Sequence, residues 1–276
     1  MADGRRRFSG LRWGLQIPPL TKGQGGLHSA MIKAVIFDFG QTLVDSADGF
    51  RQAEKEVQEK LFGHMALSLK EKFVDRYRQV RKDFHERSNF SRLAMWREVY
   101  HYHCIVPDEA LLSRWETEYW DTVKAHSILF PEVMGVLKAL NTRFHVALIT
   151  NTQGQPASGP HRIREFPELE RYFRVILVAG ENGIPPKPDP MPFRLCLQAL
   201  GVAPTEAVYV GDDWRNDVCG SRNAGLHPVW IKHESVKRNW PDVQADVPVI
   251  TRLDQLFGLD LWQACLHGFS GSRKPI

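Results

Sequence analysis

Short apolar runs, bounded by polar and turn-forming residues, recur along this chain. The first covers residues 34–37, and four later runs lie at 146–149, 175–178, 207–210 and 228–231. Runs of this length, rich in β-branched side chains, predict strands that are buried on both faces of a parallel sheet. Helical patterns separate the later runs, including residues 133–140 and 192–200. Strands that alternate with helices indicate a doubly wound α/β fold.

A different pattern fills the long interval between the first two predicted strands. Apolar side chains recur there at helical spacing in three groups: Phe50, Ala53, Val57 and Leu61; Phe73, Tyr77, Val80 and Phe84; Leu111, Trp115, Tyr119 and Val123. Turn-rich sequence bounds the interval on both sides. We therefore expect an α-helical cap subdomain at residues 47–125, inserted into an α/β core that residues 31–46 and 126–260 form.

The two ends of the chain carry weaker patterns. Residues 1–30 show neither helical nor strand periodicity, and they contain five basic residues and one acidic residue, which account for the whole net charge of +4. We expect a disordered extension there, with an organelle-targeting segment or a natural start at Met31 as the alternatives. Residues 261–276 are expected to form a C-terminal tail.

Composition and charge narrow the possible classes of protein. Hydrophobic residues make up 43% of the chain and charged residues 25%, which is typical of a globular protein. No run approaches the ~20 apolar residues of a membrane span, so we expect no membrane partner. The region after residue 30 has no net charge, which argues against nucleic-acid binding. The four cysteines are far apart and show no CxxC spacing, which favours a reducing compartment and a cytoplasmic location.

Polar residues suited to chemistry come after four of the predicted strands. In chain order these are Asp38, then Thr150 and Asn151, then Lys187, and finally Asp212, Asp213 and Asp217. Ligands of open α/β sheets bind outside the carboxyl ends of the strands, so these side chains should meet at one edge of the sheet. Taken alone, each has a structural explanation, such as a turn cap for Asp38 or a solvated loop for Lys187. Their joint occurrence in this order favours an active site.

Together these segments resemble the four motifs of the haloacid dehalogenase-like (HAD) superfamily. The matching segments are DFGQT at residues 38–42, Thr150, the pair Lys187-Pro188, and GDD with a further aspartate at residues 211–217. The resemblance covers residues 32–258 and includes a helical cap after the first motif, as in the family's phosphatases and dehalogenases. It implies an α/β hydrolase with an inserted cap.

The resemblance also implies a role for each matched residue. Asp38 is the expected nucleophile, which forms a covalent aspartyl intermediate. The expected Mg²⁺ ligands are Asp38, the main-chain carbonyl of Gly40, Asp212 and Asp213. Thr150 and Lys187 are expected to hold phosphoryl oxygens and to stabilise charge in the transition state. Asp217 is expected to hold Lys187 or a metal-bound water, and Thr42 and Asn151 to contact the substrate.

One residue departs from the family pattern. The family's phosphatases usually carry a second aspartate two residues after the nucleophile, which protonates the leaving oxygen and then activates water; here that position is Gly40. A positioned general acid or base contributes about 10²–10⁴-fold in rate, so we expect slower turnover unless another group takes over. Asp45 and Asp48 are candidates, although capping of the next helix explains both more simply.

The sequence therefore predicts a Mg²⁺-dependent phosphatase that acts on a small phosphomonoester, as a monomer or a homodimer. Two alternatives stay open because of Gly40. The family's dehalogenases also lack that aspartate and need no metal, although they do not usually keep the acidic cluster at 212–217. A weakly active or non-catalytic module of the same fold is the other alternative. Four arginines of the cap are candidate contacts for an anionic substrate, although a solvated helix face explains each more simply: Arg51, Arg78, Arg81 and Arg92.

Overall fold

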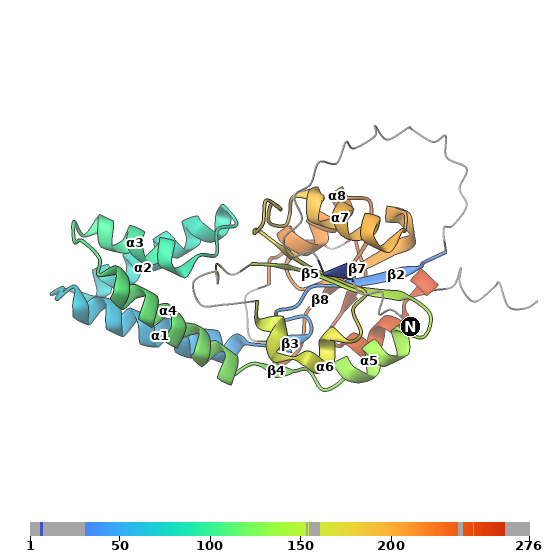
Figure 1. Ribbon diagram of the computed structural model, residues 1–276, viewed down its shortest axis with the longest axis horizontal. Helices are drawn as coiled ribbons and strands as arrows, with labels where there is room; N and C mark the ends of the chain where they lie inside the picture. Colours follow the sequence, from blue (N-terminus) through green and yellow to red (C-terminus); the bar gives the residue numbers. More distant parts are fainter. Residues whose placement is uncertain are drawn as a thin grey trace, which may run out of the picture.

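A parallel β-sheet forms the centre of the molecule (Figure 1). The structure, a computed structural model, describes residues 6–7, 31–152, 154, 161–236, 240–244 and 246–262. The strands run in the order β1-β6-β5-β2-β7-β8-β9. Their bounds are Arg6–Arg7 (β1), Ala34–Phe37 (β2), His145–Asn151 (β5), Val175–Ala179 (β6), Ala207–Gly211 (β7), His227–Ile231 (β8) and Val249–Ile250 (β9). All the pairings in this sheet are parallel, and β2 lies at its centre.

Helices cover both faces of the sheet, which confirms the predicted doubly wound α/β fold. On one face lie α5 (Val133–Leu140) and α6 (Pro167–Glu170), and on the other α7 (Pro190–Leu200) and α8 (Gly220–Asn223) (Figure 1). Neighbouring residues of β2 point to opposite faces, so Val35 and Phe37 join one buried cluster and Ala34 and Ile36 the other. Because both faces are covered, the strands read as continuous apolar runs rather than alternating ones.

Four of the helices between β2 and β5 pack around a separate apolar cluster. They are α1 (Ala47–His64), α2 (Lys70–Glu86), α3 (Arg92–Tyr102) and α4 (Glu109–Ala125). Ser91 begins α3 because its side chain accepts a hydrogen bond from the Ala94 amide, and Asp108 begins α4 in the same way. The cluster's separation from the sheet's own clusters supports our proposal that residues 47–125 are a cap, with the core at 31–46 and 126–260.

Two short strands connect this helical region to the sheet. They are β3 (Val44–Asp45) and β4 (Ile128–Leu129), which pair in antiparallel register. Arg162 lies buried beside them, and its Nη1 donates to the hydroxyls of Ser46 at 2.7 Å and Ser127 at 3.2 Å. One guanidinium from the core thus fixes both connections at the point where the chain leaves the sheet and returns.

The structure also contains elements that the sequence pattern did not predict. Arg6–Arg7 form β1 within a segment for which we expected no regular structure, since main-chain pairing with the edge of β6 requires no side-chain pattern. The rest of residues 1–30 and most of residues 261–276 lie outside the described residues. Helix α3 and the two-residue strands were also not predicted. Among the described residues, no helix is long and apolar enough to cross a membrane.

Candidate active site

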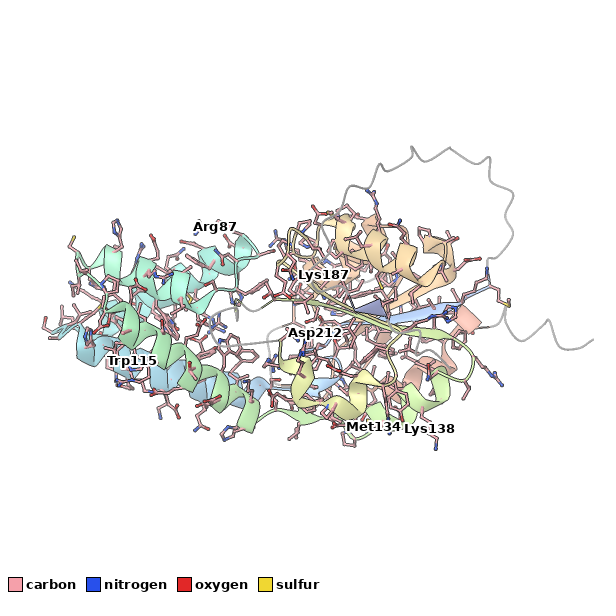
Figure 2. The ribbon with its side chains drawn as sticks, in the orientation of Figure 1. Arg87, Trp115, Met134, Lys138, Lys187 and Asp212 are labelled. Atoms are coloured by element: carbon pink, nitrogen blue, oxygen red, sulfur yellow. The ribbon has the colours of Figure 1, made fainter. Side chains whose placement is uncertain are left out.

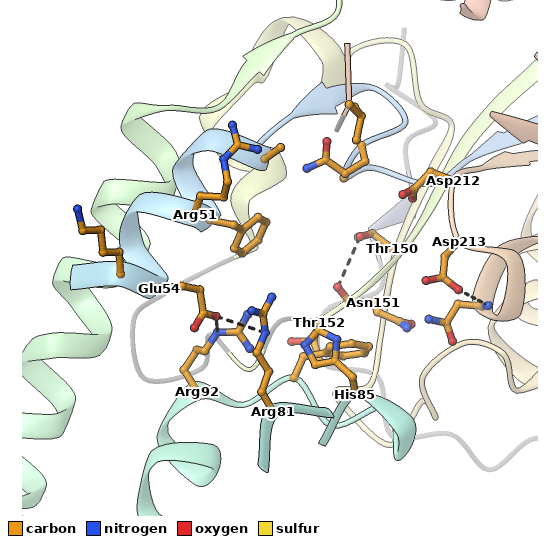
Figure 3. A pocket seen from close by; sticks show the side chains of 18 of the residues that line it. Arg51, Glu54, Arg81, His85, Arg92, Thr150, Asn151, Thr152, Asp212 and Asp213 are labelled. Atoms are coloured by element: carbon orange, nitrogen blue, oxygen red, sulfur yellow. Dashed lines mark hydrogen bonds and ion pairs between the residues drawn. The ribbon is translucent and has the colours of Figure 1, made fainter. Parts of the chain in front are cut away.

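The residues that follow the central strands line one cavity of about 800 Å³ between the sheet and the cap. Figure 2 shows Lys187 and Asp212 at this edge of the sheet, facing the helical region, and Figure 3 shows the cavity from close by. Helices α1, α2 and α3 supply the opposite wall. Nη1 of Arg215, on the core side, donates to the Glu86 carbonyl at the end of α2 at 2.8 Å. The cap therefore contacts the core beside the cavity.

Lys187 lies at the centre of the core wall and is only 2% exposed. Its Nζ donates to Asp38 Oδ1 at 2.7 Å, to Asp217 Oδ1 at 2.6 Å and to the Tyr209 hydroxyl at 2.8 Å. The Ile149 carbonyl lies at 3.1 Å from the same nitrogen. Burial alone lowers the pKa of Lys187, but Asp217 and Asp38 outweigh this and raise the pKa above its ordinary value. Lys187 is therefore a fixed ammonium beside the candidate nucleophile.

Three carboxylates meet at the same place. One oxygen each of Asp38, Asp212 and Asp217 lies within 4.8 Å of the others, and all three residues are buried. Oxygen ligands in this number suit Mg²⁺, which prefers carboxylates and water in octahedral geometry. The Lys187 ammonium balances only one of the three negative charges. The donor set and its charge therefore fit a divalent cation.

The carboxylate trio joins Asp217 to two of the predicted metal ligands, Asp38 and Asp212. Asp213 lines the cavity, and its Oδ1 accepts a hydrogen bond from the Asn216 amide at 2.8 Å, which caps the π-helix at Trp214–Cys219. The assignment of Asp213 as a metal ligand stays a prediction. Burial raises the pKa of Asp217; Lys187 opposes this shift, while Asp38 and Asp213 add to it. Neighbouring aspartates in one motif thus have different surroundings.

Gly211, at the end of β7, makes room for Asp217. A Cβ atom at this position would lie 2.4 Å from the Asp217 carboxyl carbon, closer than real side chains approach. Asp217 also accepts a hydrogen bond from the Asp213 amide at 2.9 Å through Oδ2. The glycine therefore lets the Asp217 carboxylate pack against the strand and accept the hydrogen bond from Lys187.

Thr150 lies at the end of β5 and receives support that the sequence did not indicate. Its Oγ1 lies 3.5 Å from His161 Nε2. Since the Ile163 amide donates to His161 Nδ1 at 3.2 Å, the ring proton is assigned to Nε2, which points at Thr150. Burial lowers the pKa of His161 to about 3, with Arg162 and Lys187 adding to the shift. A neutral His161 therefore orients the Thr150 hydroxyl.

The two predicted substrate contacts beside these residues have other positions. Asn151 exchanges two hydrogen bonds with the main chain of Lys187, at 2.8 and 3.2 Å, so it holds the lysine although it also lines the cavity. Thr42 is fully buried and does not line the cavity, and its carbonyl bonds to His233 at 3.0 Å. The tight turn after β2 directs Thr42 into the core, where a substrate does not reach it.

Gly40 lines the cavity, and neither candidate substitute for the missing acid does. Asp45 Oδ1 accepts a hydrogen bond from the Ala47 amide at 3.0 Å, at the start of α1. Asp48 is exposed and forms an ion pair with Arg51. A Cβ atom at Gly40 would have its nearest neighbour, Arg162 Nη2, at 3.7 Å, which is ordinary contact. There is therefore space for a side chain at position 40, next to a buried guanidinium.

The cap wall separates the four candidate arginines into two pairs. Arg51 and Arg78 have side chains that are 60% and 74% exposed, and each forms an ion pair with an exposed aspartate. Arg81 and Arg92 line the cavity, where both lie against the buried carboxylate of Glu54 (Figure 3). Arg92 is only 5% exposed. Arg51 also lines the cavity, so the solvated-face explanation is correct for Arg78 and wrong for Arg92.

Sequence reasoning missed the residues that support the candidate catalytic groups. Tyr209 reads as an apolar strand position, and the single signal of its role is a hydroxyl group within a fully buried run. His161 follows a turn-rich stretch that carries no pattern. Both residues act through contacts with Lys187 or Thr150, which depend on how separate strands are placed in space.

Comparisons with known proteins agree with this geometry. The model of the haloacid dehalogenase-like hydrolase family matches residues 32–225. A phosphoserine phosphatase from Thermus thermophilus is 38% identical over 122 residues, which are 44% of this chain and 47% of that enzyme. The chain therefore matches about half the length of this relative. An N-acylneuraminate-9-phosphatase from Mus musculus is 30% identical over 208 residues, covering 72% of this chain and 82% of that enzyme.

Solved structures show the same architecture. The crystal structure of a 2-haloacid dehalogenase from Pseudomonas syringae pv. Tomato DC3000 superposes with a TM-score of 0.58 at 26% sequence identity. The superposition covers 86% of this chain and 100% of that protein. Similarity thus extends to phosphatases and to a dehalogenase, and the chemistry of the site must distinguish between them.

Proposed function

Since the chain belongs to the haloacid dehalogenase-like hydrolases, we propose that it is a Mg²⁺-dependent phosphatase that cleaves a small phosphomonoester through a phosphoaspartyl intermediate on Asp38. The carboxylate trio of Asp38, Asp212 and Asp217 beside Lys187 is the observation that supports it most strongly. A haloacid carries no phosphoryl group whose charge needs a divalent cation, so such a cluster has no evident use in dehalogenation.

The reaction proceeds in two steps. In the first, an oxygen of Asp38 attacks phosphorus and the bond between phosphorus and the ester oxygen breaks, so that the alcohol leaves as its anion and takes a proton from water. Lys187 donates to Asp38 Oδ1, which fixes the carboxylate and assigns Oδ2 to the attack. The Thr150 hydroxyl and the Lys187 ammonium stabilise the phosphoryl oxygens. In the second step water attacks phosphorus, which restores Asp38 and releases phosphate.

Bound Mg²⁺ would withdraw negative charge from the phosphoryl group. Asp38, Asp212 and Asp217 would hold it, and Gly40 lines the cavity beside them. Asn151 keeps the Lys187 main chain in place, and Tyr209 shares its ammonium. The contact between Arg215 and Glu86 helps to close the cap, which limits the access of water during the first step.

Gly40 determines which substrates react fastest. With no carboxyl group at this position, the leaving oxygen receives no proton from the turn after β2, so esters of acidic alcohols and phenols have the advantage. The second step is also slow, since no carboxylate at position 40 activates the attacking water. We infer that the phosphoaspartyl intermediate persists longer than it does when an aspartate is present.

A 2-haloacid dehalogenase is the second candidate, and two observations favour it. Halide departure needs no proton, which agrees with Gly40, and the similar crystal structure is that of a 2-haloacid dehalogenase. In that reaction Asp38 would displace halide from carbon, and no metal would take part.

Hydrolysis of 4-nitrophenyl phosphate with and without Mg²⁺ tests the proposal. We expect turnover that requires Mg²⁺ and that Asp38→Asn abolishes. Asp48→Asn is the matched control, because Asp48 is exposed on the cap and outside the cavity, and it should retain full turnover. Activity on 2-haloacids without metal would support the dehalogenase instead. Silence on both substrates would leave a non-catalytic module.

Two further proposals concern the location and the assembly of the protein. Cys104, Cys196 and Cys219 are free thiols, which supports a reducing, cytoplasmic location. We propose a monomer or a homodimer, and size-exclusion chromatography with light scattering distinguishes the two.

A further inference from the structure

A buried carboxylate organises the cap wall of the cavity. Glu54, on α1, is 5% exposed and accepts hydrogen bonds from the Tyr77 hydroxyl at 2.6 Å and the Tyr119 hydroxyl at 2.9 Å. Nε of Arg92 lies 3.4 Å from Glu54 Oε1, and Nε of Arg81 lies 3.8 Å from the same oxygen. Burial raises the pKa of Glu54, but Arg92, Arg81 and the two hydroxyls outweigh it, so the pKa is lowered and the carboxylate stays ionised.

The charges in this cluster do not balance. Two guanidinium groups share one carboxylate, which leaves this cluster with one positive charge. Arg92 also donates from Nε to the Tyr119 hydroxyl at 3.0 Å and lies over the Tyr119 ring at 5.2 Å. Within the described residues, these contacts of Arg81 and Arg92 use Nε, and no hydrogen bond of their terminal nitrogens is found. The terminal nitrogens are the atoms that suit a planar carboxylate.

Another arginine–glutamate pair of the cap, outside the cavity, has a geometry that differs from that of the Glu54 cluster. Arg97 of α3 forms three hydrogen bonds with the Glu109 carboxylate, at 2.6, 3.0 and 3.1 Å, through Nε and Nη2. That pair is exposed and lies outside the cavity. The cap can therefore form a close, two-pronged arginine–glutamate pair, whereas Arg81 and Arg92 remain at 3.4 Å or more from Glu54. A purely structural role for Glu54 would favour the closer geometry.

We propose that Arg81 and Arg92 form a subsite for a carboxylate, so that the substrate is a phosphomonoester whose alcohol part carries a carboxylate group. The inference rests on the proposed phosphatase function, because the phosphoryl group occupies the core wall. One uncompensated positive charge matches a carboxylate monoanion, whereas a second phosphate dianion would bring more negative charge than this cluster balances. The cavity of about 800 Å³ has room for both ends of such a molecule.

The two arginines have different parts in this subsite. Arg92 is held on the Tyr119 ring and hydroxyl, so it is fixed before the substrate arrives. The Arg81 side chain is 41% exposed, and within the described residues its one ion-pair partner is Glu54. Arg81 can therefore adjust its position to the ligand. A fixed donor with a mobile partner reduces the ordering needed on binding.

Two aryl phosphates of equal size, one with a charged and one with a neutral substituent, test the subsite. We would compare kcat/KM for 3-carboxyphenyl phosphate with that for 3-carbamoylphenyl phosphate, because the amide has the same shape without the charge. The unmodified protein should prefer the carboxylate by roughly tenfold or more, the effect of a charge-assisted hydrogen bond. Arg81→Gln should remove most of this preference, mainly through a higher KM for the carboxylate ester.

Matched variants separate a local effect from a loss of charge or of folding. Arg78→Gln removes one charge from the same helix outside the cavity and should leave the preference intact. Arg92→Lys keeps the buried charge but not the planar fork, so it should weaken the preference while circular dichroism shows a folded protein. Binding of 3-hydroxybenzoate, measured by calorimetry, needs no turnover and should weaken in Arg81→Gln but not in Arg78→Gln.

The outcomes distinguish the two proposals. Equal rates for the two esters, unaffected by Arg81→Gln, would overturn the carboxylate subsite and leave the phosphatase intact. No hydrolysis of either ester would overturn the phosphatase; 3-hydroxybenzoate binding that depends on Arg81 would then still support an anion subsite, and no binding would overturn the subsite as well.

Discussion

The two walls of the cavity hold their charges in different ways. On the core wall, Lys187 makes hydrogen bonds of 2.6–2.8 Å to two carboxylates and a hydroxyl from three separate parts of the sheet edge. On the cap wall, Arg81 and Arg92 lie 3.4–3.8 Å from their shared carboxylate. The core groups are therefore fixed by short hydrogen bonds and carry an excess of negative charge that suits a metal ion, whereas the cap cluster carries an excess of positive charge.

This difference matches two separate tasks, which are catalysis at the core wall and substrate selection at the cap wall. Groups that stabilise a transition state must be fixed in advance, because any reorganisation during the reaction reduces their effect. Groups that select a substrate must instead carry a charge that the correct substrate balances. Discrimination arises because the wrong ligand leaves that charge unbalanced. The sheet edge meets the first requirement, and the Glu54 cluster meets the second.

Removing the ammonium group of Lys187 should have the largest effect on stability and turnover. Lys187→Met leaves Asp38 and Asp217 buried without their ammonium, so we expect a loss of about 3–5 kcal/mol in the free energy of unfolding, measured in urea without metal. Turnover of an aryl phosphate should fall by at least about 10³-fold. Arg97→Met, which breaks an exposed ion pair, should cost no more than about 1 kcal/mol. Similar losses in both variants would contradict the distinct role of the core wall.

The two neighbouring aspartates should differ in metal binding. Asp212→Asn removes a member of the carboxylate trio, and we expect the Mg²⁺ affinity, measured by calorimetry, to fall by about 100-fold. Asp213→Asn keeps an oxygen for the Asn216 amide and should change the affinity by only a few-fold, within about threefold. A larger loss from the Asp213 variant would place the metal as the sequence first predicted.

Restoring a carboxyl group at position 40 should raise the rates with poor leaving groups. The space is open, so Gly40→Asp should increase the turnover of alkyl phosphates toward the lower end of the usual gain, about 10²-fold. Arg162 limits the gain, because a guanidinium near the new carboxyl group favours its ionised form. Gly40→Asn has the same size and no acid, so it should give no gain. Equal rates for the two variants would show that proton transfer is not limiting.

The smallest effect concerns stability at low pH. The pKa of Glu54 is lowered in the folded protein, so its contribution to stability is present above the ordinary value near 4.5 and is lost as the pH falls through the lower folded value. Glu54→Gln should therefore flatten the decline of unfolding free energy below pH 4.5, measured in urea at a series of pH values. Glu59→Gln, an exposed residue of the same helix, should leave the decline unchanged. A steeper decline in the Glu54 variant would contradict the sign.

The sequence predicts the core wall better than the cap wall. Asp38 and Thr150 follow short apolar strands, and the parallel topology brings such positions together whatever the loops do. The resemblance paired Asp217 with Lys187, but the sequence did not show that Asp213 caps a helix or that Asp217 packs against Gly211, because both contacts depend on the path of a single turn. The strand topology thus predicts at which edge of the sheet the site lies, but not which residues hold the metal.

Which charged residues of the cap line the cavity could be learned only from the structure. Arg78 and Arg81 lie on the same helix, yet one is solvated and the other lines the cavity. Arg92 begins a helix that the pattern did not predict, and its partner Glu54 lies on a helix distant in sequence. Burial of a charge is decided by packing between helices, for which the order of residues along each helix carries too little information.

The central claim is that Asp38 carries the phosphoryl group during the reaction and that the glycine at position 40 slows its release. Rapid mixing of the protein with excess 4-nitrophenyl phosphate and Mg²⁺, followed by acid quenching and peptide mass spectrometry, tests it most directly. A slowly hydrolysed phosphoaspartyl intermediate should give a burst of nitrophenol close to one equivalent of protein and a phosphate group on the peptide that contains Asp38. Steady release without a burst and without phosphate on that peptide, in a protein that turns over the substrate, would contradict it.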